Sequence, residues 1–198
     1  MTTWTPRNFE RGPLRHWLQA TGSLSARLAA SGEVFSVQVL RQGREALAAD
    51  EAQALRMADR RIGYVREVLL RVDGVAMVFA RSVTRHTDSL GAWRAVRGLG
   101  ARPLADVLFT RSGITRQPLN YRQFAQHTAP HRRVVQHWQA AHTQPGEPRD
   151  LPRSLPARRS VFDRQGAHLL VMEVFIAPRT AWLAPCKLTS PIHKRTTS

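Results

Sequence analysis

Two ionisable side chains occupy strand positions whose neighbours are apolar. The stretch GYVREVLLRVDG, residues 63–74, reads as a strand followed by a turn, and Arg66 shares one face of it with Tyr64, Val68 and Leu70, because successive side chains of a strand point to opposite sides. A guanidinium keeps its proton inside a protein, so an arginine facing the core needs an anionic partner. That partner is either a carboxylate of the protein or one belonging to a ligand.

Glu173 raises the same question with the opposite sign. It lies in LLVMEVFIA, residues 169–177, and shares a face with Leu169, Val171 and Phe175. The other face of this segment is apolar as well, which is typical of a strand covered on both sides. We therefore expect Glu173 to be buried.

Two explanations of this pair stay open at the level of sequence. Arg66 and Glu173 could form a salt bridge with each other inside the core. Alternatively, both could line one closed polar pocket and face opposite ends of a single ligand.

The elements that carry these side chains are two predicted hairpins. Asp73-Gly74 predicts the turn of the first, over residues 63–83, and Gln165-Gly166 predicts the turn of the second, since both pairs suit two-residue turns between apolar runs. The remaining periodicity predicts helices over about 13–20 and 23–31, a strand over about 33–41, a helix with Asp50 as its N-cap, a helix from near Ser89 to Gly98 or Gly100, and an extended or mixed segment in RPLADVLFT.

The segment 117–156 has a different character, with four of the eight histidines and six prolines. NYRQFAQHT and HRRVVQHWQAAH are each predicted to be helical, and TQPGEPRDLPRSLP is predicted to be a loop. His127 and His131 are four residues apart, and His137 and His142 follow. Pro130 argues against a regular helix between the first two, and we predict no metal site.

Composition limits the class of protein. Hydrophobic residues make up 42% of the 198, no run approaches the ~20 apolar residues of a membrane span, and no secretory signal begins the chain, so we expect a globular cytoplasmic protein. The single cysteine, Cys186, lies in a predicted mobile tail, residues 179–198, and cannot form an internal disulfide. The sequence supports neither Cys/His nor Ser/His catalysis.

The net charge is +16, with +6 in residues 1–110 (16 basic, 10 acidic) and +10 in residues 111–198 (14 basic, 4 acidic). A charge of this size is compatible with nucleic-acid binding. No helix-turn-helix, zinc-finger or aromatic-basic RNA motif accompanies the charge, so we expect a solvated basic surface that attracts small anions rather than a specific nucleic-acid site.

Several blocks together resemble the chorismate pyruvate-lyase family. They are HWLQATGSLSARLAASGEVFSVQVLRQG, YVREVLLRVDG, RPLADVLFT and RRSVFDRQGAHLLVMEVF, in that order, covering roughly Leu14 to Pro178. The resemblance implies an α+β fold with an antiparallel sheet of about six strands and an internal ligand site under helical flaps. It implies one domain over residues 1–178, with 117–156 as an insertion, and a monomer.

The family's activity converts chorismate to 4-hydroxybenzoate and pyruvate on the way to ubiquinone. By resemblance, Arg66 binds the ring carboxylate, Glu173 lies at the hydroxyl end of the ring, and Leu24 and Leu104 contact the ligand. Leucine at position 24 departs from a frequent methionine. No cofactor or metal is implied, because aromatisation of the ring drives the elimination.

Two further questions stay open. Arg116, in ITRQPL, could face the pyruvyl carboxylate or be a surface arginine. The alternative function is a non-catalytic protein that binds small aromatic acids, since effector-sensing domains of some transcription regulators share the fold. Only about a dozen residues of this sequence precede the first block, so we do not expect the N-terminal helix-turn-helix domain of such a regulator.

Overall fold

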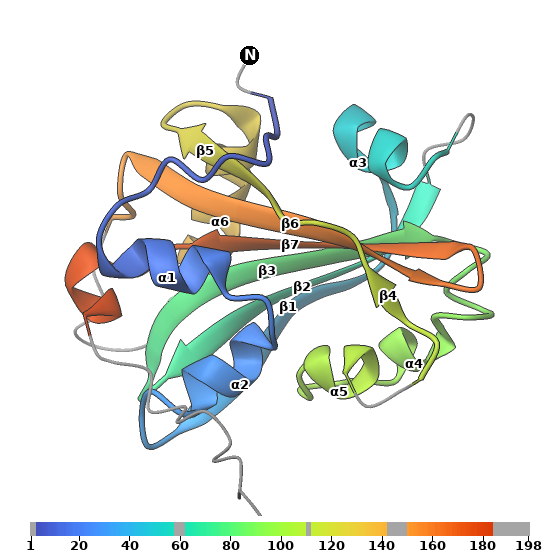
Figure 1. Cartoon of the computed structure of the whole chain (residues 1–198), viewed down its shortest axis with the longest axis horizontal. Coiled ribbons are helices and arrows are strands. Elements are labelled where there is room, and N and C mark those ends of the chain that lie inside the picture. Colours follow the sequence, from blue (N-terminus) through green and yellow to red (C-terminus); the bar gives the residue numbers. More distant parts are fainter. Residues whose placement is uncertain (1–2, 58–61, 110–111, 142–149, 184–198) are drawn as a thin grey trace, which may run out of the picture.

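The computed structural model describes residues 3–57, 62–109, 112–141 and 150–183. Within these residues the chain forms one antiparallel sheet with helices on both faces (Figure 1). The strands run in the order β1-β2-β3-β7-β6-β4, and β5 also pairs with β6. The strands are β1 (Phe35–Ala46), β2 (Ile62–Val72), β3 (Val75–Arg85), β4 (Thr115–Arg116), β5 (Asn120–Ala125), β6 (Ser154–Arg164) and β7 (Ala167–Phe175). The α+β class is confirmed, and the described residues hold seven strands where about six were expected.

Both predicted hairpins are confirmed. Asp73 and Gly74 join β2 to β3 with φ angles of 49° and 81°, and Gln165 and Gly166 join β6 to β7 with φ angles of 55° and 81°. Two successive residues with positive φ match the twist of a tight hairpin. The turns fix the register of both strand pairs, and that register decides which side chains share a face.

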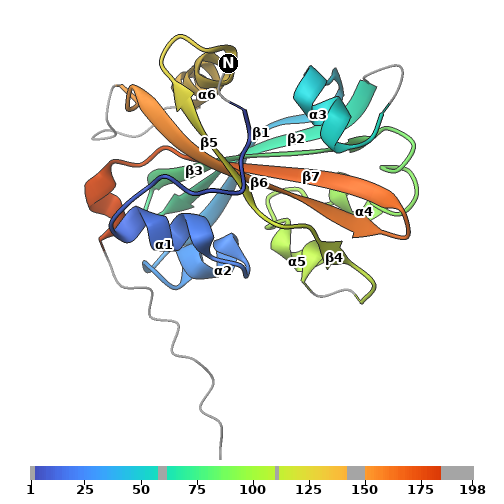
Figure 2. The same cartoon turned by 45° about the horizontal axis from the view of Figure 1, so that its top comes forward.

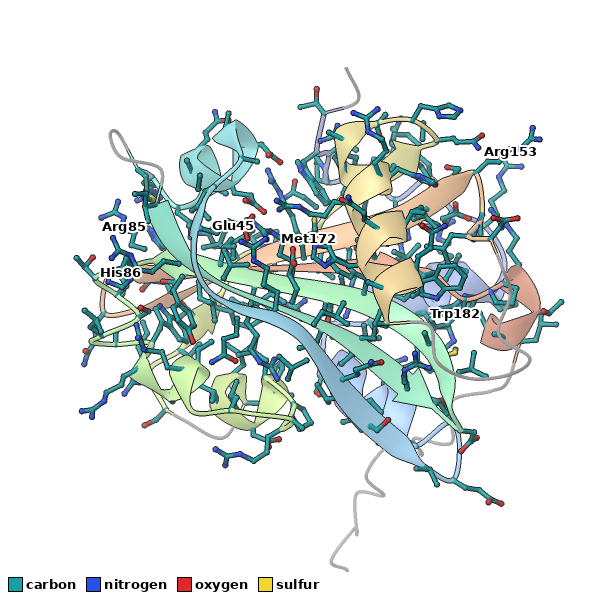
Figure 3. All side chains as sticks on the ribbon, turned by 180° about the vertical axis from the view of Figure 1, so that it is seen from behind. Glu45, Arg85, His86, Arg153, Met172 and Trp182 are labelled. Carbon is teal, nitrogen blue, oxygen red and sulfur yellow. The ribbon has the colours of Figure 1, made fainter. Side chains whose placement is uncertain are left out.

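The helices divide between the two faces of the sheet (Figure 2). They are α1 (Pro13–Gln19), α2 (Leu24–Ala29), α3 (Ala49–Ala54), α4 (Arg94–Arg97), α5 (Ala105–Leu108), α6 (Ala129–Ala140) and the 3-10 helix η1 (Arg179–Trp182). Helices α1, α2, α4 and α5 pack on the face that carries Tyr64, Val68 and Leu70, and α3 and α6 pack on the face that carries Val65 and Leu69. Figure 3 shows the second face, with Glu45 and Met172 between α3 and α6.

Three local predictions were wrong. Residues 120–125 form strand β5 rather than a helix, because a helix of so few residues is marginal alone and the edge of β6 offers them a full set of hydrogen bonds. Asp50 is not an N-cap: α3 begins at Ala49, and Glu51 accepts a hydrogen bond from the N–H of Ala48 at 3.0 Å. The helix expected from Ser89 is helical only over Arg94–Arg97.

Two other segments are more ordered than their composition suggested. RPLADVLFT contains a short helix, α5, at Ala105–Leu108. The segment 117–156 supplies β5 to the sheet, and its α6 buries Val134 and Trp138 against the second face, so its described part belongs to the main domain.

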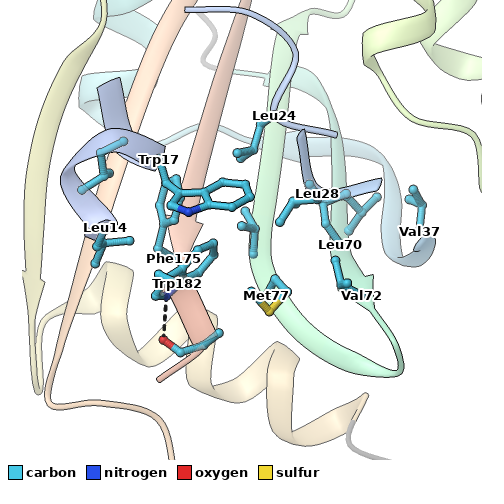
Figure 4. Packing of buried hydrophobic residues seen from close by; sticks show 14 residues of the cluster. Leu14, Trp17, Leu24, Leu28, Val37, Leu70, Val72, Met77, Phe175 and Trp182 are labelled. Carbon is cyan, nitrogen blue, oxygen red and sulfur yellow. Dashed lines mark hydrogen bonds between the residues drawn. The ribbon is translucent and has the colours of Figure 1, made fainter. Parts of the chain in front are cut away.

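The C-terminal boundary lies later than Pro178. Trp182 is 1% exposed, and its ring centroid lies 5.4 Å from that of Trp17 and 5.1 Å from that of Phe175. Its indole N–H donates to the Ala177 carbonyl at 3.2 Å (Figure 4). A tail that begins at residue 179 is therefore wrong for residues 179–182, because a large aromatic side chain anchors them to the core. Cys186 and the rest of the predicted tail lie outside the described residues.

Candidate active site

The first face of the sheet carries a cavity between α2 and α5. Its empty space amounts to about 600 Å³, including its opening to solvent. All four residues predicted by resemblance line this one cavity, together with Arg116, whose position was left open: they are Leu24, Arg66, Leu104, Arg116 and Glu173. Apolar side chains such as Val68, Phe162 and Val171 form much of the remaining wall.

Arg66 enters the cavity from β2 with no counter-ion among the described residues. The residue is 3% exposed, and its Nη2 donates to the carbonyls of Gly100 and Arg102, each at 2.9 Å. Its Nε is buried without a hydrogen-bond partner, and no carboxylate of the described chain forms an ion pair with it. Burial lowers the pKa of the Arg66 guanidinium, although the nearby Tyr64 opposes this shift. A cation held in this way can bind an anion from outside the protein.

Glu173 has a different partner. Its Oε2 accepts a hydrogen bond from Arg158 Nε at 2.5 Å, and the Arg158 side chain is 1% exposed. Arg158 Nη1 donates to the carbonyls of Trp17, Leu18 and Ala20 at 3.0, 3.1 and 2.7 Å. These carbonyls end helix α1, where a cation is favoured. In the described structure Glu173 therefore forms its salt bridge with Arg158 and not with Arg66.

The strand register explains why Arg66 and Glu173 share a cavity without touching. Arg66 pairs with Ser82 on β3, which pairs with Val171 on β7, so Glu173 lies two strands away and two residues along the sheet. With strands about 4.8 Å apart and ~3.4 Å per residue, the two Cα atoms are separated by about 12 Å. Both side chains line the same cavity, so one ligand can contact both.

Leu24 and Leu104 bring helix starts to the cavity. Leu24 is the first residue of α2, where Ser23 caps the helix by accepting from the N–H of Ala26 at 3.0 Å, and Leu104 immediately precedes α5. The first N–H groups of a helix have no partner within it. Besides packing, both positions can therefore offer main-chain donors to an anionic ligand.

Arg116 is part of the cavity wall rather than a surface side chain. It lies on β4 opposite Phe162, and its guanidinium carbon is 5.2 Å from the centre of that ring. Its Nη1 donates to the Thr21 carbonyl, and its Nε is buried without a partner. Burial lowers the pKa of Arg116, and the neighbouring charge of Arg158 lowers it further, while Glu173 raises it.

Arg158 is the site residue that sequence reasoning missed. A signal was present, because the turn at Gln165-Gly166 pairs Arg164 with Ala167. Stepping back six residues on one strand and forward six on the other places Arg158 opposite Glu173. The predicted hairpin thus contained the pairing, although hydrophobic periodicity alone did not show it.

An ionic cluster lies on the opposite face of the same strands. Arg81 is 1% exposed and its Nε and Nη1 bond to Glu51 and Glu67, each at 2.7 Å. Burial alone would lower the pKa of Arg81, but hydrogen bonding to Glu51 and the charges of Glu67 and Glu45 raise it above its usual value. Because Arg81 lies next to Ser82 and Glu67 next to Arg66 in the sequence, this cluster fixes the strands that form the floor of the cavity.

The histidines of the segment 117–156 have separate surroundings. His127 precedes α6 with a φ of 67°, His131 bonds to the Pro152 carbonyl at 3.0 Å, and His137 lies 3.2 Å from Glu67, whereas His142 is outside the described residues. In the described ranges no three His, Cys, Asp or Glu side chains gather closely enough to hold a metal ion.

Comparisons with known proteins identify the family of this chain. A family model described as Chorismate lyase matches residues 2–182. A protein of Albidiferax ferrireducens named Probable chorismate pyruvate-lyase is 56% identical over 92% of this chain and 90% of its own, and one of Aromatoleum aromaticum with the same name is 40% identical over 88% and 91%. The chain belongs to the chorismate lyase family.

Solved structures with the same fold have low sequence identity to this chain. The structure titled PhnF from Mycobacterium smegmatis has a TM-score of 0.55 at 15% identity, covering 80% of this chain and 65% of its own. A PhnF C-terminal domain has a TM-score of 0.52 at 15% identity, covering 76% and 87%. At this identity the likeness defines the fold alone. Of the helices in the described ranges, none has both the length and the apolar character needed to cross a membrane.

Proposed function

We propose that this protein is a chorismate pyruvate-lyase that converts chorismate to 4-hydroxybenzoate and pyruvate. The observation that carries the proposal is the pairing of charges around one cavity. Arg66 is buried without a carboxylate partner in the described chain. Glu173 lies two strands away from Arg66 and is held by Arg158. A ligand with a carboxylate at one end of a ring and a hydroxyl at the other matches this arrangement.

Arg66 binds the ring carboxylate. Nη2 of Arg66 donates to the carbonyls of Gly100 and Arg102, whereas Nε has no partner among the described residues. The guanidinium can therefore donate charge-assisted hydrogen bonds to the carboxylate. The two carbonyls hold the guanidinium in place before the ligand arrives, which reduces the entropy lost on binding.

Glu173 accepts a hydrogen bond from the ring hydroxyl at C4. Arg158 occupies Oε2, which leaves Oε1 free to face the cavity. The ion pair also fixes the carboxylate rotamer, so the acceptor is positioned before the substrate binds.

The reaction itself is an elimination in which atoms and electrons balance. The bond between C3 and the ether oxygen breaks, and its electron pair leaves with the enolpyruvate. The proton at C4 is lost, the C4–H electron pair becomes part of the aromatic ring, and protonation of the enolpyruvate gives pyruvate. The residues that bind and orient the substrate lower the entropic barrier, and the apolar wall restricts water. No redox partner enters this balance.

The direct test is to incubate purified protein with chorismate and to measure both products. We expect equal amounts of 4-hydroxybenzoate and pyruvate, at a rate that scales with protein concentration. Tight binding of chorismate or 4-hydroxybenzoate without turnover would contradict the proposal and favour the non-catalytic binding protein.

A further inference from the structure

The cavity holds more positive charge than one carboxylate needs. Of the charged side chains at the site, Glu173 is balanced by Arg158, and the Arg81 side chain belongs to the cluster on the opposite face. Arg66 and Arg116 both line the cavity, and neither forms an ion pair with any carboxylate that the structure describes. A ligand that balances the site therefore carries two negative charges.

The two unbalanced arginines enter from opposite sides. Arg66 is on β2 and is held by the carbonyls of Gly100 and Arg102, whereas Arg116 is on β4 and is held by the carbonyl of Thr21, just ahead of α2. Four strand steps separate β2 from β4 in the sheet, up to about 19 Å between Cα atoms. Two long side chains that reach one cavity from such distant strands can bind two different groups of a ligand.

Arg116 retains hydrogen-bonding capacity that its structural contact does not use. One nitrogen donates to Thr21, while Nε is buried and unpartnered, and the ring of Phe162 covers one side of the guanidinium. A structural tie to a single carbonyl does not account for the buried Nε, which has no hydrogen-bond partner among the described residues. Burial also lowers the pKa of Arg116, a cost that a bound anion offsets.

We propose that Arg116 binds the carboxylate of the enolpyruvyl side chain of chorismate, while Arg66 binds the ring carboxylate. This inference rests on the proposed function and adds a second anion subsite to it. Held at both carboxylates, the side chain has a fixed orientation over the ring before the C3–O bond breaks. Arg116 is also the cation on the side of the departing enolpyruvate, where negative charge develops. After the elimination, 4-hydroxybenzoate keeps only the ring carboxylate and no longer contacts Arg116.

The product provides the sharpest test, because it lacks the second carboxylate. Arg116→Gln keeps a donor for the Thr21 carbonyl but removes the charge. We expect kcat/KM for chorismate to fall on the order of 10²–10³-fold, as for loss of a buried charge-assisted contact. The affinity for 4-hydroxybenzoate, measured by calorimetry, should stay within about threefold of the unaltered protein. Arg66→Gln should instead weaken the binding of both chorismate and 4-hydroxybenzoate.

Arg164→Gln is the matched control. Arg164 lies on β6 near Phe162 and also donates to a main-chain carbonyl, that of Ala92 at 2.8 Å, but it does not line the cavity. The Arg164→Gln variant should leave kcat/KM for chorismate and the affinity for 4-hydroxybenzoate unchanged. The proposed subsite is wrong if Arg116→Gln leaves kcat/KM for chorismate unchanged. It is also wrong if the variant lowers the affinity for 4-hydroxybenzoate by as large a factor as it lowers kcat/KM for chorismate.

Failure of the subsite and failure of the proposed function give different results. If the unaltered protein binds chorismate without turning it over, the proposed activity fails. The subsite is then tested by chorismate affinity alone: a loss in Arg116→Gln with 4-hydroxybenzoate affinity retained supports it, and equal chorismate affinity overturns it.

Discussion

Arg158 and Glu173 face each other across β6 and β7, and their Nε–Oε2 distance is 2.5 Å. The same guanidinium donates to three carbonyls at the end of α1. One side chain therefore fixes the orientation of Glu173 and attaches a helix to the sheet. Arg66, by contrast, has only neutral carbonyls as partners. The two buried arginines should respond differently to replacement.

Replacing Arg158 by methionine should strongly destabilise the fold. Glu173 would keep a largely buried charge without its partner, and the carbonyls of Trp17, Leu18 and Ala20 would lose a donor. Breaking a buried pair in this way costs about 3–5 kcal/mol. Urea unfolding monitored by circular dichroism measures the change, and Arg15→Met, at an exposed position of α1, is the control. A loss of stability no larger than that of the control would show that the pair contributes nothing.

Replacing Arg66 by methionine should affect binding rather than stability. Arg66 is buried without a counter-charge in the described chain, so an apolar side chain of similar length should leave the melting temperature nearly unchanged or raise it. The affinity for 4-hydroxybenzoate should fall by about 2–5 kcal/mol, because the ring carboxylate loses the cation assigned to it. Thermal unfolding and calorimetry on the same preparation test both parts. A large drop in melting temperature with unchanged affinity would indicate a structural arginine.

Glu173→Gln keeps the shape of the side chain and should chiefly lower the rate of turnover. We expect kcat at saturating chorismate to fall by about 10²–10⁴-fold, since the C4 end of the ring loses its charged acceptor. Loss of the ion pair with Arg158 should lower stability as well, so rates are compared per folded molecule. Single-turnover mixing separates the chemical step from product release. A kcat equal to that of the unaltered protein would remove Glu173 from the mechanism.

The charge cluster around Arg81 predicts a loss of stability in acid. Burial would raise the pKa of Glu45, but Arg81, Arg133 and Arg41 outweigh it and lower that pKa below its usual value of 4.5. A carboxyl whose pKa is lower in the folded state stabilises the fold above the unfolded pKa, and this contribution is lost as the pH falls through the folded pKa.

Glu45→Gln should therefore flatten the dependence of the unfolding free energy on pH below about 4.5. Urea titrations over a series of acidic buffers measure this slope, with the exposed Glu33→Gln as the control. A slope equal to that of the unaltered protein at every pH would show that the pKa of Glu45 is the same in the folded and unfolded states.

Turnover of chorismate should survive exhaustive treatment with a chelator and need no added nucleotide. The proposed elimination balances without a redox partner, and the groups assigned to the substrate are arginines and a glutamate. The measurement is the initial rate before and after chelation, with metal analysis of the treated protein. Loss of activity that a divalent ion restores would contradict the metal-free mechanism.

The sequence alone placed Arg66 and Glu173 on apolar strand faces and located both hairpin turns. These features are local, because alternation along a strand and positive φ at a tight turn depend on neighbouring residues. The hairpin register even contained the Arg158–Glu173 pairing. Resemblance to a family then added Leu24 and Leu104, whose apolar side chains carry no chemical signal of their own.

Tertiary structure decided the rest through contacts between distant segments. Residues 120–125 became a strand because the edge of β6 was available to pair with them, and Trp182 was anchored by aromatic rings of α1 and β7. Whether Arg116 lies at the surface or in the cavity wall depended on where β4 joins the sheet, a pairing that no local pattern encodes. The partner of a buried charge is likewise set by distances across the fold, so only the assembled sheet showed that Arg66 has no carboxylate beside it within the described chain.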